Sequence, residues 1–426
     1  MSFAQSKRTA PWPVLLTIAG GLSLLALLAG GWLYANDPRV YYHVEEWRAR
    51  LYDAFNPRPN VLPTPVIAVQ LPSAASPTPA SIPTSAPAQA DPALTHPPTT
   101  ASPTPLPKQV TLTGFRHEFQ RFNNCGPASV AVNLSHWGWR GSQDDTAPAL
   151  KPDWHDKNVS PAEIYNFLTT IGFDAYIRVN GDLDTLKRFI AAGYPVLVEK
   201  GFECHLKNRC SGWYGHYSVL SGYDDGQQVF TFQDTFLGPD LKVSYADTLT
   251  DWRAFNYLYL VIFPADPKRD AEVSALLGPA VDLEQSYREA LARTQREALT
   301  LTGQDAAFAW FNVGTNLHYL QDYAGAAQAY DEARTIGLPY RMAWYQFGMY
   351  RAYFYVARYQ DVIAVATFAI ESTPSPGLEE AFYWRGQAHQ SLGQPEKAIE
   401  DYKQALITHP DYEPARHALS ALGVTP

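Results

Sequence analysis

Proline crowds one internal segment of this 426-residue chain. Of the 34 prolines, 15 lie between Pro57 and Pro107, in repeated Pro-Thr-Pro, Ser-Pro and Ala-Pro motifs. Proline lacks a backbone N–H and has a fixed φ, so a segment this rich in it cannot build a packed core. We expect residues 57–108 to be a disordered, extended linker. At about 3.1 Å per residue it would reach at most ~150 Å. Its expected role is to hold the C-terminal part of the chain away from the membrane that the N-terminal part is expected to enter.

The N-terminal stretch is apolar and long. Residues 10–36 contain no charged residue, and Lys7 and Arg8 precede them. About 20 apolar residues span a bilayer, and basic residues beside a span favour the cytoplasmic side. The sequence therefore predicts a cytoplasmic N-terminus over 1–11, a transmembrane helix in the lipid bilayer over 12–35, and extracytoplasmic placement of the remainder. A cleaved signal peptide is the alternative, but the run is too long for one and its end is a poor cleavage site.

Apolar residues recur at helical spacing after this stretch. Val40, Val44, Trp47 and Leu51 would share one face of a helix. We predict a juxtamembrane helix within residues 36–56. The pattern fits a helix lying on the lipid and a stalk helix equally well.

The charge balance excludes one class of partner. The chain has 33 lysines and arginines against 42 aspartates and glutamates, and residues 270–426 alone hold 19 acids and 11 bases. No basic face is available for a phosphate backbone, so nucleic acid is not expected as a partner.

Residues 109–265 read as helices followed by antiparallel strands. A helix is expected from just after Cys125 to about Trp137, a capping box at Ser160 and Glu163 opens a second one, and a third covers residues 183–192. Strand-like runs follow at residues 195–198, 216–220, 229–232 and 257–263. This order predicts an α+β domain.

Residues 270–426 carry a repeat of 34–38 residues, with aromatic, glycine, alanine and proline positions in the same order in three units. The pattern resembles the tetratricopeptide repeat, most closely in the third unit at residues 394–402. The second unit has about two extra residues before Tyr359, so a longer first helix or turn is expected. The resemblance implies an all-α solenoid that docks a protein partner.

One cysteine has the setting of a nucleophile. Cys125 is expected at a helix N-terminus, where free N–H groups stabilise a thiolate, and Gly126 leaves room for an approaching carbonyl. Of the histidines in this domain, His216 fits a general base best, because it begins a strand that enters the core. Asp234, at the end of the next strand, would hold the imidazole. Gln120 would donate to the oxyanion beside the Cys125 N–H.

The ordered set Gln120, Cys125-Gly126-Pro127, His216 and Asp234 resembles papain-like cysteine peptidases, specifically the bacteriocin-processing, double-glycine family. That resemblance implies a papain-like cysteine peptidase domain over 109–265, with Cys125 as nucleophile, His216 as general base, Asp234 as its orienting group and Gln120 in the oxyanion hole. The best-known members are fused to an exporter, which this chain lacks. Their double-glycine substrate is therefore not carried over.

The other two cysteines bracket a short loop. Cys204 and Cys210 would form a disulfide in an oxidising compartment, leaving Cys125 free. A metal site with His205 is the weaker alternative, since no fourth ligand is evident. Trp213 and Tyr214 fit a cleft lining and a core role equally well.

The sequence predicts a membrane-anchored, extracytoplasmic cysteine peptidase that cleaves peptide bonds through an acyl-enzyme. Two alternatives remain open: a catalytically inactive adaptor, and an acyl-transferring, transglutaminase-like enzyme. Neither a metal nor a cofactor is predicted, because the zinc-helix, phosphate-loop and dinucleotide motifs are absent.

Overall fold

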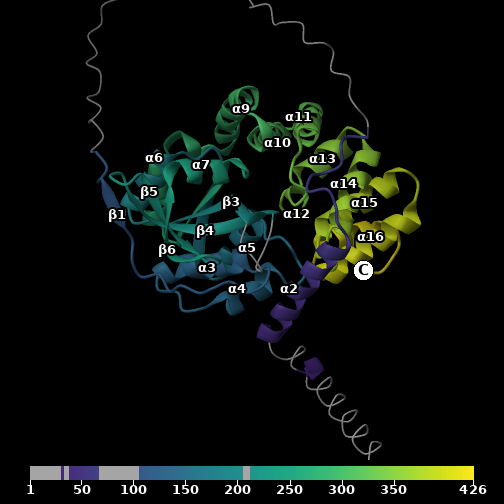
Figure 1. Cartoon of the computed structure of the whole chain (residues 1–426), viewed down its shortest axis with the longest axis horizontal. Coiled ribbons are helices and arrows are strands. Elements are labelled where there is room, and N and C mark those ends of the chain that lie inside the picture. The colour runs from purple at the N-terminus through teal and green to yellow at the C-terminus, as the bar shows by residue number, and fades with distance from the viewer. Residues whose placement is uncertain (1–29, 33–37, 67–104, 205–211) are drawn as a thin grey trace, which may run out of the picture.

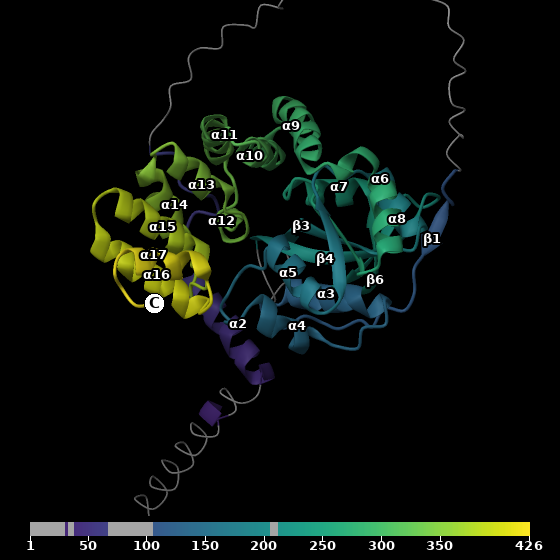
Figure 2. The same cartoon turned by 180° about the vertical axis from the view of Figure 1, so that it is seen from behind.

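A computed structural model describes residues 30–32, 38–66, 105–204 and 212–426 (Figure 1). A mixed α/β domain is followed by a helical region that curves along one side of it, as the sequence predicts. Helix α2 (Pro38–Phe55) lies where the two parts meet, which both views show (Figure 2). It matches the helix expected within residues 36–56.

The described part of the α/β domain contains one seven-stranded sheet in the order β2-β7-β3-β4-β5-β6, with β1 paired to the end of β4. Every pairing is antiparallel. The strands are β1 (Gln109–Thr111), β2 (Phe173–Arg178), β3 (Val196–Cys204), β4 (Gly212–Asp224), β5 (Val229–Asp234), β6 (Gly238–Ser244) and β7 (Tyr259–Pro264).

The sheet is buried on both faces, and its strands alternate between two cores. In β7, Leu260 and Ile262 belong to the core under α3, whereas Val261 and Phe263 belong to the core on the other face. Successive side chains of a strand point to opposite faces, so helices are needed on both sides. Those helices are α3 (Cys125–His136), α4 (Gln143–Leu150), α5 (Pro161–Thr170), α6 (Leu183–Ala191), α7 (Tyr245–Arg253) and α8 (Pro267–Leu277).

Local sequence signals fix several of these elements. The expected capping box is present: Ser160 Oγ accepts from the Glu163 N–H, and Glu163 accepts from the Ser160 N–H. All the predicted helices and strands of this domain are present. For most of the strands, the ends differ from the predicted ends by a few residues. The sequence does not predict strands β1, β2 and β6 or helices α4 and α7. Since β2 lies between α5 and α6, the helices do not all precede the strands.

The helical region consists of paired helices. They are α9 (Leu283–Thr300), α10 (Gly303–Tyr319), α11 (Tyr323–Ile336), α12 (Met342–Tyr345), α13 (Gly348–Tyr355), α14 (Tyr359–Glu371), α15 (Glu379–Ser391), α16 (Pro395–Thr408) and α17 (Glu413–Ala421). Gly314 and Gly386 occupy equivalent places, where an added Cβ would lie 2.6 Å from the rings of Tyr330 and Tyr402. The small and aromatic positions of the repeat are therefore packing partners.

The second unit has the longer first helix that the sequence predicts. Helix α13 ends seven residues past Gly348, whereas α10 and α15 end five residues past Gly314 and Gly386. The break that separates α12 from α13, at the extended Gln346, carried no sequence signal. Both views show α12 between the repeat helices and the sheet (Figures 1 and 2).

The chain that follows α2 is bonded to the repeats. We call residues 60–66 the strap. The Leu62 N–H donates to Leu338 O at 2.9 Å, and the Leu62 side chain is buried in the repeat core. Arg334 donates to the carbonyls of Pro63 and Thr64 at 2.8 and 3.0 Å. The linker expected over 57–108 thus begins with a bound segment, and residues 67–104 lie outside the described residues.

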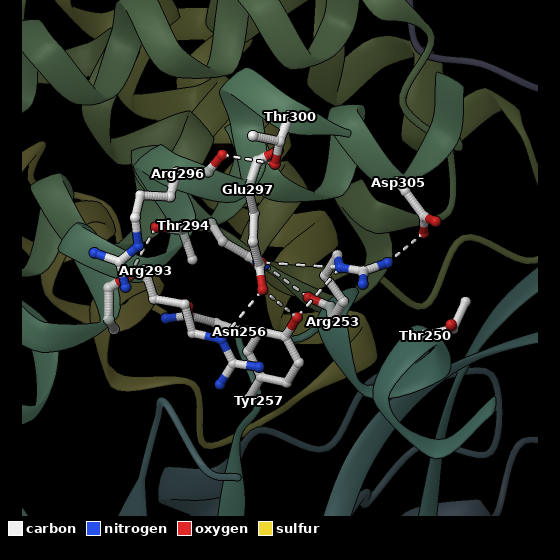
Figure 3. A network of polar contacts seen from close by, with 12 residues as sticks. Thr250, Arg253, Asn256, Tyr257, Arg293, Thr294, Arg296, Glu297, Thr300 and Asp305 are labelled. Carbon is white, nitrogen blue, oxygen red and sulfur yellow. Dashed lines mark hydrogen bonds and ion pairs between the residues drawn. The ribbon is translucent and has the colours of Figure 1, made fainter. Parts of the chain in front are cut away.

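A polar seam joins the sheet domain to the first repeat helices (Figure 3). Arg253 forms an ion pair with Asp305 at 2.7 Å, and Tyr257 Oη donates to Glu297 at 2.7 Å. Beside them, Asn256 donates to Asn316 at 2.6 Å. The partners come from opposite sides of the domain boundary, so the repeats are held in a defined position against the sheet.

No helix of the described residues is long and apolar enough to cross a membrane. The helix expected over 12–35 lies outside the described residues except for residues 30–32. The expected extracytoplasmic placement stays a prediction.

Candidate active site

Cys125 is the first residue of α3, at the N-terminus that the sequence predicts. The N-cap Asn124 makes no side-chain capping hydrogen bond with the described residues, so the first turn keeps free N–H donors. Ser129, one turn later, donates to Tyr217 O at 2.9 Å and fixes α3 against β4. The nucleophile candidate is thereby held next to the strand that carries His216.

His216 and Asp234 meet across the β4–β5 hairpin. His216 Nε2 lies 3.1 Å from Asp234 Oδ2, and both side chains are buried. The other aspartate oxygen accepts from the N–H groups of Phe236 and Leu237 at 3.0 and 2.8 Å. These bonds fix the carboxylate, which leaves His216 Nδ1 for the cysteine.

Cys125 and His216 line the same pocket and interact electrostatically. Burial acts to raise the pKa of the thiol, but His216, the Tyr217 N–H and the Lys151 charge bring that pKa below its usual value. Burial acts to lower the pKa of His216, whereas Asp234 and Cys125 raise it to about 9. The pKa of Asp234 lies well below its usual range despite burial, mainly because of His216. The arrangement favours a thiolate beside an imidazolium.

Gln120 is placed beside this group by one residue that sequence reasoning missed. Thr235, which follows Asp234, donates from Oγ1 to Gln120 Oε1 at 3.0 Å, and its carbonyl accepts from the Gln120 N–H at 2.8 Å. With its oxygen so occupied, the Gln120 amide has its NH2 end available to donate. That is the end an oxyanion requires.

A pocket opens beside Cys125 and His216, and three of its other lining residues are of special interest. Glu199 is a buried carboxyl group whose pKa is raised well above the usual value by burial. Lys157 lies in the loop before α5, and burial lowers its pKa to about 7. Tyr345 belongs to the repeats. Glu199 and Lys157 carried no sequence signal, since an isolated acid in a strand and a lysine in a loop are ordinary.

Tyr345, the last residue of the short helix α12, is the residue through which this helix lines the pocket. An added Cβ on Gly215 would lie 2.9 Å from its ring, so the ring covers the residue before His216. The Trp213 ring stacks on Phe255 and lies at the same contact, 6.2 Å from the Tyr345 ring. Trp213 therefore has a core role at the domain boundary, one of the two roles the sequence left open.

The cysteines divide as expected. Cys204 is disulfide-bonded and Cys125 is free. Cys210 and His205 lie outside the described residues. Two other histidines have structural roles: His136 contacts the carbonyls of Thr113 and Gly193, and His155 contacts Asp153.

Comparison with known proteins gives two family matches. Residues 107–260 match the Peptidase_C39 like family, and this range includes Gln120, Cys125, His216 and Asp234. Residues 379–412, the third repeat unit, match the tetratricopeptide repeat. Both resemblances that the sequence indicated are thereby confirmed. None of the curated proteins compared with the chain matches it.

Several solved structures resemble part of this chain. A C39-like peptidase from Bacillus anthracis is 15% identical, with a TM-score of 0.30, and the aligned region spans 37% of this chain and 98% of the peptidase chain. A double glycine motif protease from an AMS/PCAT transporter, in complex with a leader peptide, is 15% identical, with a TM-score of 0.27, and covers 37% and 98%. MamA is 15% identical, with a TM-score of 0.25, and the aligned region spans 37% of this chain and 86% of the MamA chain.

Proposed function

Because residues 107–260 match a peptidase family and the repeats follow, we propose that this chain is a membrane-anchored, extracytoplasmic cysteine peptidase whose repeats dock a protein partner. The observation that carries the peptidase proposal is the buried chain of contacts from Cys125 through His216 to Asp234. A structural cysteine has no need of an imidazole held by a buried carboxylate.

The reaction begins when the Cys125 thiolate attacks the carbonyl carbon of a peptide bond and forms a C–S bond. The Cys125 N–H and the Gln120 amide stabilise the oxyanion, and the His216 imidazolium gives its proton to the leaving nitrogen as the C–N bond breaks. His216 then takes a proton from water, which attacks the thioester. Hydrolysis releases the acid and returns the thiol.

The repeats contribute to the site as well as to docking. Tyr345 closes one side of the pocket, so the substrate chain beside Cys125 passes between the sheet domain and the repeats. The partner surface of the repeats remains part of the proposal.

The anchor proposal rests on the sequence. The uncharged residues 10–36 are long enough for a span, and the preceding Lys7 and Arg8 favour a cytoplasmic N-terminus. The disulfide at Cys204 supports an oxidising compartment.

The test is alkylation of Cys125 in the full-length chain as a function of pH, read by mass mapping. Rapid labelling well below the ordinary thiol pKa of about 8.5, abolished in His216→Ala and retained in His417→Ala, is expected. His417 is an exposed histidine on α17 and controls for histidine removal. Slow labelling with the ordinary thiol profile in all three proteins contradicts the proposal and favours the inactive adaptor.

A peptide-library digest then defines the reaction. New carboxyl termini that disappear in Cys125→Ala support hydrolysis. Adding a primary amine distinguishes acyl transfer, because the amine would then appear in the product.

A further inference from the structure

A second cluster of polar side chains lies at the boundary between the sheet domain and the repeats, outside the catalytic group. Glu163 comes from α5, Glu379 begins α15, and His409 ends α16. One ligand atom from each lies within 4.8 Å of the others. Helix α5 and the two helices of the third repeat unit, which are far from α5 in the sequence, thus place two carboxylates and an imidazole together.

The charge of Lys151 acts on Glu379 and Asp156, but Lys151 forms no ion pair with either of them. Among the described residues, no lysine or arginine forms an ion pair with Glu163, Glu379 or Glu380, and the nearest bonded group is His409, at 3.2 Å from Glu379 Oε1. Lys151, also near the boundary, donates instead to the carbonyls of Asn123 and Trp154.

Buried oxygen atoms around the cluster lack partners. Glu379 is 2% exposed and its Oε2 atom has no hydrogen-bond partner in the described part of the chain. The same holds for Asp156 Oδ2 and Glu380 Oε2, whose residues are 1% and 9% exposed. Unpaired buried carboxyl oxygens are costly, so a group that satisfies them is expected.

From these observations we propose that Glu163, Glu379 and His409 bind a divalent transition-metal cation that ties the sheet domain to the third repeat unit. In a tetrahedral zinc site the ligand atoms are roughly 3.4 Å apart, given metal–ligand distances of about 2.1 Å. From a separation of 4.8 Å, the three atoms would approach one another by at most about 1.4 Å to reach that spacing.

The donor set selects the class of cation. Imidazole nitrogen suits zinc and its neighbours, whereas calcium and magnesium prefer oxygen alone. Glu163 remains able to bind, because its capping bond uses Oε2 and leaves Oε1 for the metal. Three protein ligands leave a fourth position for water.

The experiment measures zinc binding by calorimetry and thermal unfolding in the full-length Cys125→Ala chain, which removes the catalytic thiolate as a competing ligand. One equivalent of Zn²⁺ is expected to bind and to raise Tm. Adding Glu379→Gln or His409→Gln should weaken binding by at least about tenfold and abolish the rise in Tm.

The matched control is His417→Gln. His417 pairs with Glu413 on the surface of α17, which gives the same residue types without burial. It should bind zinc as the parent chain does. If a Glu379 variant fails to fold, Glu163→Gln replaces it, since glutamine also caps a helix.

Two results would overturn the proposal. One is an equal change in Tm with zinc in the parent, the cluster variants and the control, including no change in any of them. The other is calcium binding that His409→Gln leaves intact, because an all-oxygen site needs no imidazole.

Discussion

At the scale of single residues, Asp234 has the most consequential environment. It is fully buried, it accepts from two backbone N–H groups, and it contacts both His216 and Ser218. Its negative charge is the main reason that His216 holds a proton up to a pKa of about 9 in spite of burial. The charge of Asp234 therefore sets the upper end of the pH range in which thiolate and imidazolium coexist.

The expected pH dependence of activity follows from the lowered pKa of Cys125 and the raised pKa of His216. Activity should rise as pH passes the lowered thiol pKa and fall as His216 loses its proton near pH 9. Asp234→Asn removes the charge that raises the His216 pKa, so the alkaline limb of kcat/KM should move down by about one unit or more. Asp240→Asn is the control, because Asp240 is exposed and bonds to Gln233 instead. An unmoved limb would contradict this assignment.

Ser218 gives a second residue-scale prediction. Its Oγ donates to Asp234 Oδ2 at 2.7 Å. A hydrogen bond to a charged group contributes about 1.5 kcal/mol, so Ser218→Ala should lower kcat/KM by about tenfold without unfolding the protein. Ser221→Ala removes a buried serine from the same strand that bonds to Thr231 O, and should have a smaller effect. Equal losses in both variants would show a general packing effect.

At the scale of elements, the loop before α15 docks on the loop before α5. Gly377 O accepts from the Lys157 N–H at 3.0 Å, and an added Cβ on Gly377 would lie 2.2 Å from the backbone of His155. Gly377→Ala must separate the two loops and should lower the free energy of unfolding by about 2 kcal/mol. Gly226→Ala, in an exposed turn, should change it little. Denaturant unfolding of both variants measures this, and similar values would refute close docking.

The strap depends on one buried ion pair. Arg334 and Asp361 lie 3.0 Å apart with fully buried side chains, and both also bond to the strap. Arg334→Met removes the bonds to Pro63 and Thr64 and leaves Asp361 paired with Arg358 alone, so it should lower the free energy of unfolding by about 1–3 kcal/mol. Limited proteolysis should then cut within residues 60–66. Arg416→Ala, which removes an exposed pair with Asp411, should leave the strap protected.

The elements also show which site residues can be predicted from the sequence and which cannot. Cys125, His216, Asp234 and Gln120 can be found because short motifs around them predict a helix start and strand ends. Tyr345 cannot, because its place depends on how α12 packs on Gly215 across 130 residues of chain. The bound strap cannot be predicted from the sequence for a similar reason. Its prolines indicate an extended chain, but the contacts of that chain depend on side chains of the distant repeats.

At the scale of the whole molecule, the position of the folded body relative to the proposed anchor is set by α2 and the strap. Both ends of the proline-rich segment are fixed, since Val66 bonds to Asp361 and Pro107 O accepts from Tyr223. Residues 67–104 therefore connect two points on one body. This differs from the expected role of holding the C-terminal part of the chain away from the membrane.

A distance measurement tests this. A dye at His417→Cys, in the Cys125→Ala chain reconstituted in vesicles, reports energy transfer to a labelled membrane. Duplicating residues 67–104 should leave the transfer unchanged, whereas inserting about 20 flexible residues before Pro38 should reduce it. If residues 67–104 instead held the folded body away from the membrane, energy transfer would fall in the chain with the duplication as well as in the chain with the insertion.

The bound strap has a further consequence for processing. A single proteolytic cut between residues 67 and 104 would divide the chain into an N-terminal fragment that carries α2 and a C-terminal fragment that carries both domains. Because the strap is held by Arg334, Leu338 and Asp361, the two fragments would stay associated as a nicked complex. Cleavage there would create new termini without releasing the α/β domain from the N-terminal fragment.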